Sequence, residues 1–262
     1  MRATFKICLL AAAMLMVWAT AALAGTLVGT DGPDTLTGTA EPDQLYAESG
    51  DDTLDGLEGD DYLEAGSGAD TVSGGDGADL TIAGTGIDRV DAGKGDDVVY
   101  AGADDDTVLG GAGRDTLFGQ AGADMLFGGG DADRLYASAG GDVADGGSGA
   151  DRLTSDAGDA TLIGGRGDDV IAAGRGSVTV RGGPGSDRIR TGNGQDKVTG
   201  GSGRDGIATG AGNDEANVRD GRRDRVNCGP GDDSVRADPD DVLRRCETVI
   251  HEDASATPRH RR

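Results

Sequence analysis

Aspartates recur every nine residues through most of the chain, and they supply the side chains that could do chemistry. Counting from Gly29 in steps of nine gives twenty-one consecutive blocks that end at Asn217 without an insertion or deletion. The sixth place of each block is Asp except at Ala160 and Val178. Carboxylate oxygens are preferred ligands of hard divalent cations. A single such Asp would indicate a solvated turn residue, but a row of them in phase indicates metal binding.

No arrangement of residues in the chain predicts catalysis. The sequence contains neither the H-E-x-x-H pattern of zinc proteases nor the G-x-S-x-G pattern of lipases. Its two histidines, His251 and His260, lie near the end of the chain, where no base could be buried and oriented. We therefore expect no enzymatic activity.

The remaining places of the block predict the elements that position the aspartates. Gly is frequent at places one, two and four, where it permits a turn with left-handed backbone. The last three places alternate around a Leu, Ile or Val at place eight, which is the two-residue period of a strand. Residues such as Leu117, Leu126, Leu135 and Leu153 are then predicted to stack into apolar ladders that fill a thin core.

Composition and charge exclude several classes of protein. The chain has 50 Gly and 3% aromatic residues, too few large apolar side chains for a conventional globular core. It has 48 acidic residues against 24 basic ones, a net charge of −24. Nucleic acid and anionic membranes would repel such a chain, so cations are the better partners. Gly-rich, acidic composition also fits a disordered linker, but the strict period favours a repeat fold.

Blocks such as GGAGRDTLF (110–118), GGSGADRLT (146–154) and GGRGDDVIA (164–172) resemble the nonapeptide G-G-x-G-x-D-x-U-x of haemolysin-type, or RTX, calcium-binding repeats. The resemblance covers residues 29–217. It implies an all-β fold, a parallel β-roll with two nonapeptides per coil and calcium ions held between successive coils.

The resemblance also implies which residues bind calcium. In the family an ion lies between a block and the next block but one, held by both place-six aspartates and by turn carbonyls. The metal ligands expected here are Asp52, Asp61, Asp70, Asp79, Asp88, Asp97, Asp106, Asp115, Asp124, Asp133, Asp142, Asp151, Asp169, Asp187, Asp196, Asp205 and Asp214. Sites beside Glu41, Asp104 or Asp131 at place four are open to two interpretations, since these side chains could add a ligand oxygen or strain the turn.

Electrostatics makes the counter-ion essential to this expected fold. Stacked carboxylates about 4.8 Å apart repel each other by on the order of 3 kcal/mol per pair before screening. We therefore expect folding to require calcium. Ala160 and Val178 fall in alternate blocks of the chain, the fifteenth and the seventeenth, and so on the same edge. We therefore expect one continuous roll with a gap in calcium binding on that edge, between about residues 142 and 196.

Residues 1–24 are expected to be a secretory signal peptide. Arg2 and Lys6 precede an apolar run, and Ala22-Leu23-Ala24 fits a cleavage site. The alternative is a retained membrane anchor, although the run is shorter than a full span. After cleavage we expect no membrane insertion and a secreted, extracellular or surface-attached protein.

The end of the chain departs from the repeat. The phase slips by one residue after Asn217, and we interpret 218–250 as a cap on the array at 25–217. Cys228 and Cys246 are 18 residues apart, or one coil, so an exported chain could pair them as a disulfide; two free thiols are the alternative. Residues 251–262 are expected to form a disordered basic tail.

The signal, array and cap account for the whole sequence, so we expect the array itself to carry the function. The leading hypothesis is a secreted calcium-binding protein with a structural or adhesive extracellular role, whose further partner would be a cell surface or a polysaccharide. The alternative is a haemolysin-like toxin or an accessory module of a polysaccharide-modifying enzyme.

Overall fold

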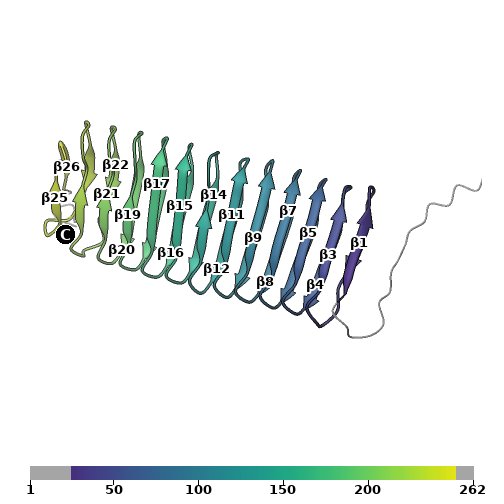
Figure 1. Ribbon diagram of the computed structural model, residues 1–262. Helices are drawn as coiled ribbons and strands as arrows, with labels where there is room; N and C mark the ends of the chain where they lie inside the picture. The colour runs from purple at the N-terminus through teal and green to yellow at the C-terminus, as the bar shows by residue number, and fades with distance from the viewer. Residues whose placement is uncertain (1–24, 252–262) are drawn as a thin grey trace, which may run out of the picture.

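The protein is a rod built from a single type of coil, as the computed structural model in Figure 1 shows. The structure describes residues 25–251. It contains twenty-six strands and no helix in that range. No helix within 25–251 is long and apolar enough to cross a membrane. The predicted signal peptide and the tail beyond His251 lie outside the described residues.

The strands form two parallel sheets of thirteen strands each. The odd sheet contains β1 (Thr26–Thr30), β3 (Gln44–Glu48), β5 (Tyr62–Ser67), β7 (Leu80–Thr85), β9 (Val98–Ala103), β11 (Thr116–Ala121), β13 (Arg134–Tyr136), β15 (Arg152–Ala157), β17 (Val170–Arg175), β19 (Arg188–Arg190), β21 (Gly206–Ala208), β23 (Arg225–Asn227) and β25 (Val242–Arg244). The even sheet contains β2 (Thr35–Thr37), β4 (Thr53–Glu58), β6 (Thr71–Asp76), β8 (Arg89–Lys94), β10 (Thr107–Ala112), β12 (Met125–Gly130), β14 (Val143–Ser148), β16 (Thr161–Arg166), β18 (Thr179–Pro184), β20 (Lys197–Ser202), β22 (Glu215–Asn217), β24 (Ser234–Arg236) and β26 (Thr248–Ile250).

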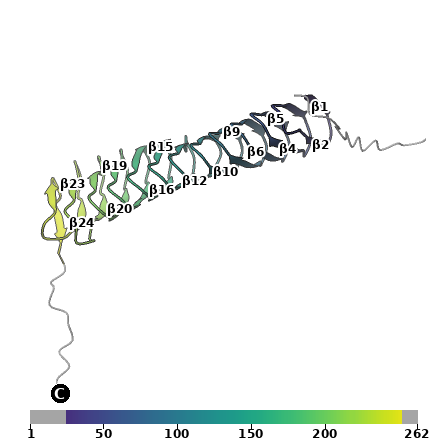
Figure 2. The ribbon, with the colours of Figure 1, turned by 90° about the horizontal axis from the view of Figure 1, so that it is seen from below.

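Each strand pairs with the strand one coil later, so the chain winds as a solenoid. In the array the register is eighteen residues, as for Leu117 with Leu135 and Leu126 with Ala144. Figure 2 shows the odd strands along one side of the rod and the even strands along the other. Thirteen strands at about 4.8 Å make a rod on the order of 60 Å long. The predicted parallel β-roll with two repeats per coil is confirmed.

The core is a thin layer between the two sheets. Leu117, Leu126, Leu135 and Leu153 are fully buried, and the other place-eight side chains continue the two ladders. Each coil adds only a few apolar side chains and buries them against the coils before and after it. Apolar burial therefore accumulates along the rod and has no separate centre.

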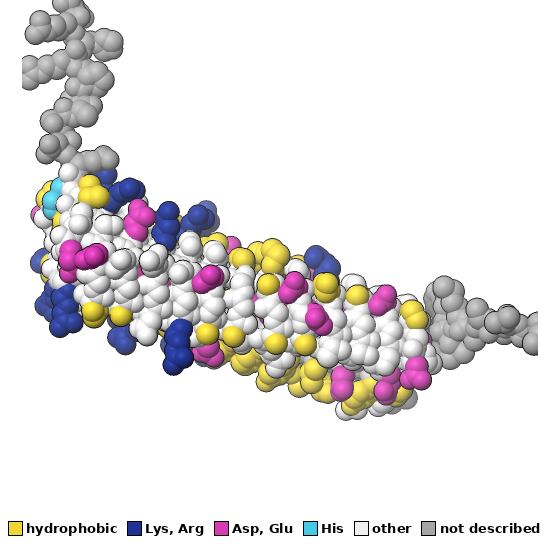
Figure 3. Space-filling model, turned by 90° about the horizontal axis from the view of Figure 1, so that it is seen from above, with side chains coloured by type: hydrophobic (Ala, Val, Ile, Leu, Met, Phe, Trp, Pro, Cys, Tyr) yellow, Lys and Arg dark blue, Asp and Glu magenta, His cyan; other side chains and the backbone are white. Residues whose placement is uncertain are grey.

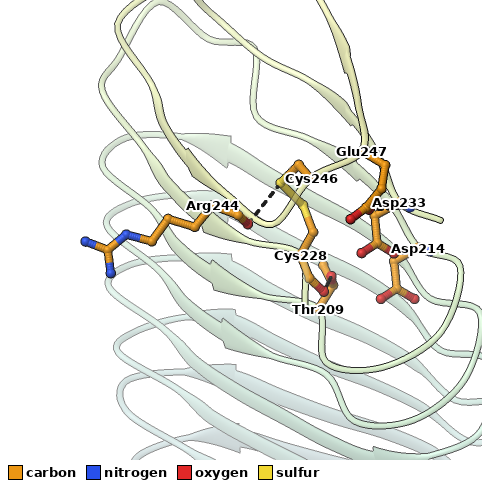
Figure 4. Close-up of a disulfide and its surroundings, with 7 residues drawn as sticks. All are labelled: Thr209, Asp214, Cys228, Asp233, Arg244, Cys246 and Glu247. Carbon is orange, nitrogen blue, oxygen red and sulfur yellow. Dashed lines mark hydrogen bonds between the residues drawn. A yellow bond between two sulfur atoms is a disulfide. The ribbon is translucent and has the colours of Figure 1, made fainter. Parts of the chain in front are cut away.

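Both sheets continue beyond the last regular block into the predicted cap. The strands from Arg225 to Ile250 pair in parallel with the array, and the extra residue after Asn217 lengthens the register to nineteen in two coils. Cys228 and Cys246 form a disulfide there, with an S–S distance of 2.04 Å. Figure 4 shows this bridge between neighbouring coils, beside Asp214, Asp233 and Glu247. The final coil is thus tied covalently to the one before it.

Candidate metal sites

The place-six aspartates lie in the turns that join the two sheets, directly before a strand. Turns that lead into the even sheet form one edge of the rod, and turns that lead into the odd sheet form the other. We name the aspartates of the first edge the interrupted row: Asp34, Asp52, Asp70, Asp88, Asp106, Asp124, Asp142, Asp196, Asp214 and Asp233. Those of the second edge form the continuous row: Asp43, Asp61, Asp79, Asp97, Asp115, Asp133, Asp151, Asp169, Asp187, Asp205 and Asp224.

One carboxylate oxygen of each interior aspartate is used to join coils. The Oδ1 atom of Asp115 accepts a hydrogen bond of 3.0 Å from the backbone N–H of Asp97. Asp115 in turn donates its N–H to Oδ1 of Asp133, at 2.8 Å. The same bond repeats along both rows and brings the predicted site residues of each edge into register. The rows end at Asp241 and Glu247, whose carboxylates accept from Asp224 and Asp233.

The second carboxylate oxygen has no partner among the described residues. Every predicted metal ligand is buried, with 3% exposure or less. In each of them Oδ2 is shielded from solvent and accepts no hydrogen bond. A buried, unpaired carboxylate oxygen is costly, so each row presents a series of atoms that need a cation.

Burial changes the acidity of these groups. Desolvation raises the pKa of Asp97, Asp106 and Asp133 to about 7, although a backbone N–H bond opposes the shift. The pKa of Asp115 rises to about 6 for the same reason. A carboxyl shifted in this way resists ionisation unless a positive charge lies beside it.

Space for such a charge exists beside the unpaired oxygens. A Cβ added to Gly146 would lie 2.5 Å from Oδ2 of Asp151 and 2.6 Å from the carbonyl oxygen of Gly164. A carboxylate oxygen and a carbonyl oxygen from the next coil therefore border one small space that glycine leaves open. Within 25–251 no three His, Cys, Asp or Glu side chains converge. Each position between two neighbouring coils of a row offers only the two aspartate carboxylates of those coils. Carbonyl oxygens of the turns must therefore supply the other ligands of a metal site.

These features fit calcium. It takes six to eight oxygen ligands from carboxylates and carbonyls in a flexible geometry, whereas magnesium demands a near-ideal octahedron. The residues that would hold it are the place-six aspartates of neighbouring coils in one row.

The glycines of the turn are required by the backbone. Gly113, at place four, has φ +124, and an added Cβ would lie 1.8 Å from the carbonyl oxygen of Gly95. Asp104 and Asp131 replace Gly at this place and have φ of 79 and 72. These two aspartates therefore adopt the strained left-handed conformation. Neither side chain makes a hydrogen bond to the described residues.

The structure adds residues to the rows that the sequence-based ligand set leaves out. Asp224 and Asp233 follow the phase slip, yet each is buried and has an unpaired Oδ2. The sequence feature that could have identified both residues is the Asp-x-Val pattern, which persists after the phase slip. Asp34 and Asp43 differ, because their Oδ2 atoms already accept hydrogen bonds from Thr30 and Thr39.

Comparison with known proteins identifies the repeat. The family model for the RTX calcium-binding nonapeptide repeat, in units of four copies, matches overlapping stretches that together span residues 28–216. The chain belongs to this RTX family. It is therefore a calcium-binding repeat protein, and calcium is its cofactor. No curated protein matches the chain.

One solved structure of a similar protein is that of a hyperactive, Ca2+-dependent, β-helical antifreeze protein from an Antarctic bacterium. It is 20% identical in sequence, with a TM-score of 0.40, and the match covers 84% of this RTX chain and 86% of that chain.

Proposed function

We propose that this RTX protein is exported, folds when it binds calcium and then serves as a rigid structural or adhesive element outside the cell. The observation that carries the proposal is the double row of buried Oδ2 atoms without partners. A calcium-free roll would retain all of these unpaired groups at once. Calcium would supply the charge that lets the coils stack.

The ligands we propose are the aspartates of the two rows with unpaired Oδ2 atoms. Each ion would lie between two coils, and the carboxylates of both would hold it together with turn carbonyls. Calcium supplies positive charge and oxygen coordination at these points. The chain's own residues orient the carboxylates, because the Oδ1 bond fixes each side chain against the preceding coil.

Two features support export. The first is the predicted signal peptide at 1–24, and the second is the disulfide between Cys228 and Cys246, a bond typical of oxidising compartments. Cytosolic calcium is far below the millimolar range in which extracellular modules bind it. The chain would then remain unfolded before export and fold outside.

We propose a role in binding and structure and no enzymatic role. The described residues form a rod of repeated coils whose recurring feature is the pair of carboxylate rows. Attachment and mechanical support require a regular surface and stiffness, both of which a solenoid provides.

Circular dichroism and size-exclusion chromatography of residues 25–262 test calcium-coupled folding. We expect an expanded chain in chelator and a compact β-rich rod near millimolar calcium. Magnesium at the same concentration is the matched control and should not restore the fold. A chain that is already compact in chelator would contradict the proposal. Secretion of the full chain, compared with a variant lacking 1–24, tests export separately.

A further inference from the structure

The outer face of the odd sheet changes character along the rod. From β9 to β13 it carries a stack of rings, with centroids 4.7 Å apart for Tyr100 and Phe118 and 4.6 Å for Phe118 and Tyr136. From β17 to β25 it carries arginines around small residues. Figure 3 shows the matching trend in charge, with Lys and Arg toward the C-terminal end and none at the N-terminal end. Residues 25–88 contain no Lys or Arg at all.

The arginines border a shallow cavity of about 580 Å3 on this face. Gly206 and Ala208 of β21 form part of its floor. Arg188 and Arg190 of β19 stand on one side, and Arg225 of β23 stands on the other. Two strand spacings, about 9.6 Å, separate these walls. The absence of a large side chain on β21 therefore opens a hollow between two sets of guanidinium groups.

These guanidinium groups have no partners within residues 25–251. The ion pairs of the described chain involve other basic residues, such as Lys94 with Asp76 and Arg114 with Asp96. Arg188, Arg190, Arg225 and Arg244 form no ion pair and no other polar side-chain contact with the described residues. Asp187 and Asp224 directly precede Arg188 and Arg225 in the chain, but both aspartates are buried whereas the arginines are exposed, so the guanidinium charge is available to an external anion.

We infer that this cavity, which we name the arginine trough after Arg188, Arg190, Arg225 and Arg244 in its lining, binds an anionic polysaccharide of the uronate type. The inference rests on the proposed function, because it names the kind of surface to which the rod attaches. Carboxylates on successive sugars would be held by the planar guanidinium groups, which recognise carboxylates through two parallel hydrogen bonds. The sugar rings would lie over Gly206 and Ala208.

The aromatic stack lies on the same sheet face as the trough, and β15 separates it from the strands that line the trough. Tyr136 is the last ring of the stack, and the next strand carries Thr154 in register with it. One face of Tyr136 therefore has no ring against it. Arg134 and Arg152 lie beside it on the same sheet face. This half-buried ring, flanked by arginines, can contact a sugar through its exposed part while the arginines bind the carboxylate of the sugar.

The same features disfavour other anions. Proteins that bind single-stranded nucleic acid offer successive free ring faces for successive bases, whereas the faces here are largely covered by one another. A membrane would require apolar side chains that protrude and insert, but the valines that line the trough, Val170 and Val242, are half-buried. The net charge is no obstacle in calcium. The aspartates with unpaired Oδ2 atoms form 7 neighbouring pairs on the interrupted row and 9 on the continuous row. One divalent ion for each of these 16 pairs would bring more positive charge than the −24 of the chain.

Fluorescence anisotropy with a labelled galacturonate hexamer tests the inference on the calcium-folded chain at physiological ionic strength. We expect binding of the hexamer and none of its methyl ester, which keeps the rings and hydroxyls but lacks the charge. The hexamer with calcium alone is the blank. Equal binding of the methyl ester would overturn the inference.

Three variants locate the site. Arg188→Ala/Arg190→Ala/Arg225→Ala should weaken binding about tenfold or more. The control Arg166→Ala/Arg181→Ala/Arg204→Ala removes the same charge elsewhere and should retain binding within about twofold. Gly206→Leu fills the hollow without changing charge, and should also weaken binding, since an added Cβ has room there. Equal losses in the two triple variants would overturn the inference.

Two further outcomes would also overturn it. The first is a thymidine oligonucleotide of matched charge that binds more tightly than the hexamer and depends on the same arginines. The second is a dimer, seen by light scattering, that the trough variants disrupt, which would make the trough a contact between copies. Circular dichroism of each sample separates these results from a failure of calcium-dependent folding, so a folded rod that does not bind leaves the proposed function standing.

Discussion

The two edges of the rod differ most clearly in the stretch where one of them lacks carboxylates. On the interrupted row, Ala160 and Val178 are buried in the apolar core. On the continuous row, Asp169 accepts an N–H bond from Asp151 and donates its own N–H to Asp187. Both sheets pass through these coils without a break. Strand pairing and the core therefore do not need the carboxylates, which indicates that the aspartates are present for a ligand.

The edges differ at a second position. Turns of the continuous row have Gly at place one in every block except that of Ala92. Turns of the interrupted row mostly carry a small side chain there, such as Ala47, Ser155 or Thr191. The place-one glycine leaves the space beside Oδ2 and a carbonyl oxygen, as Gly146 shows. We therefore expect the continuous row to bind calcium more tightly.

The largest effect should come from opening a second gap opposite the first. Asp169→Ala/Asp187→Ala removes three neighbouring pairs from the continuous row, at coils where the other edge already lacks them. The calcium midpoint of folding, measured by circular dichroism, should rise about fivefold more than in the control variant described next, a coupling of about 1 kcal/mol between the two edges. Limited proteolysis should then cut near residues 160–190.

The matched control is Asp97→Ala/Asp115→Ala. It removes the same charge and the same number of pairs from the same row, but the facing edge is intact there. We expect a distinctly smaller rise in the calcium midpoint. Equal shifts would contradict the idea that the two edges support each other through shared coils.

Restoring the interrupted row should give the next largest effect. Ala160→Asp/Val178→Asp recreates the pairs with Asp142 and Asp196, and three more calcium ions should bind per chain, as counted by mass spectrometry after dialysis. The double Asn variant is the control of similar shape. An unchanged ion count would show that the pairs are not the sites.

Acid should partly replace calcium. The pKa of Asp97 and of Asp187 is raised to about 7 in the fold, against about 4 in the unfolded chain. The stability from keeping such groups protonated is fully present below the unfolded pKa and is lost as pH rises through about 7. A calcium-free chain should therefore have more β structure at pH 5 than at pH 8, by circular dichroism. Less structure at the lower pH would contradict the burial of these carboxyls.

The repeat made much of this architecture predictable from sequence. A fixed nine-residue period determines which residues stack, so the roll and the rows follow from Asp-x-Leu patterns such as that of Asp115 and Leu117. The rest depends on contacts between coils. The use of Oδ1 by a backbone N–H is invisible in sequence, because it joins residues eighteen apart through the backbone. The trough around Gly206 likewise requires knowing which residues share the outer face of one sheet.

The smallest expected effect is a gain in stability when Gly replaces a place-two residue with left-handed backbone, and it should be the same on both edges. Leu57 and Gln120 stand at place two, where Gly is usual, and have φ of 78 and 73. Leu57 lies on the continuous edge and Gln120 on the interrupted edge. Left-handed backbone costs a residue with a Cβ about 1–2 kcal/mol, and the greater freedom of Gly in the unfolded chain offsets part of the gain. Leu57→Gly and Gln120→Gly should each stabilise the calcium-loaded rod by about 0.5 kcal/mol in urea titrations.

The Ala variants are the controls, since they shorten the side chain but keep the strain, and they should not stabilise. If Ala and Gly had equal effects, the side chain and not the backbone would be responsible. Similar gains on both edges would show that backbone strain is local to each turn and does not distinguish the two edges.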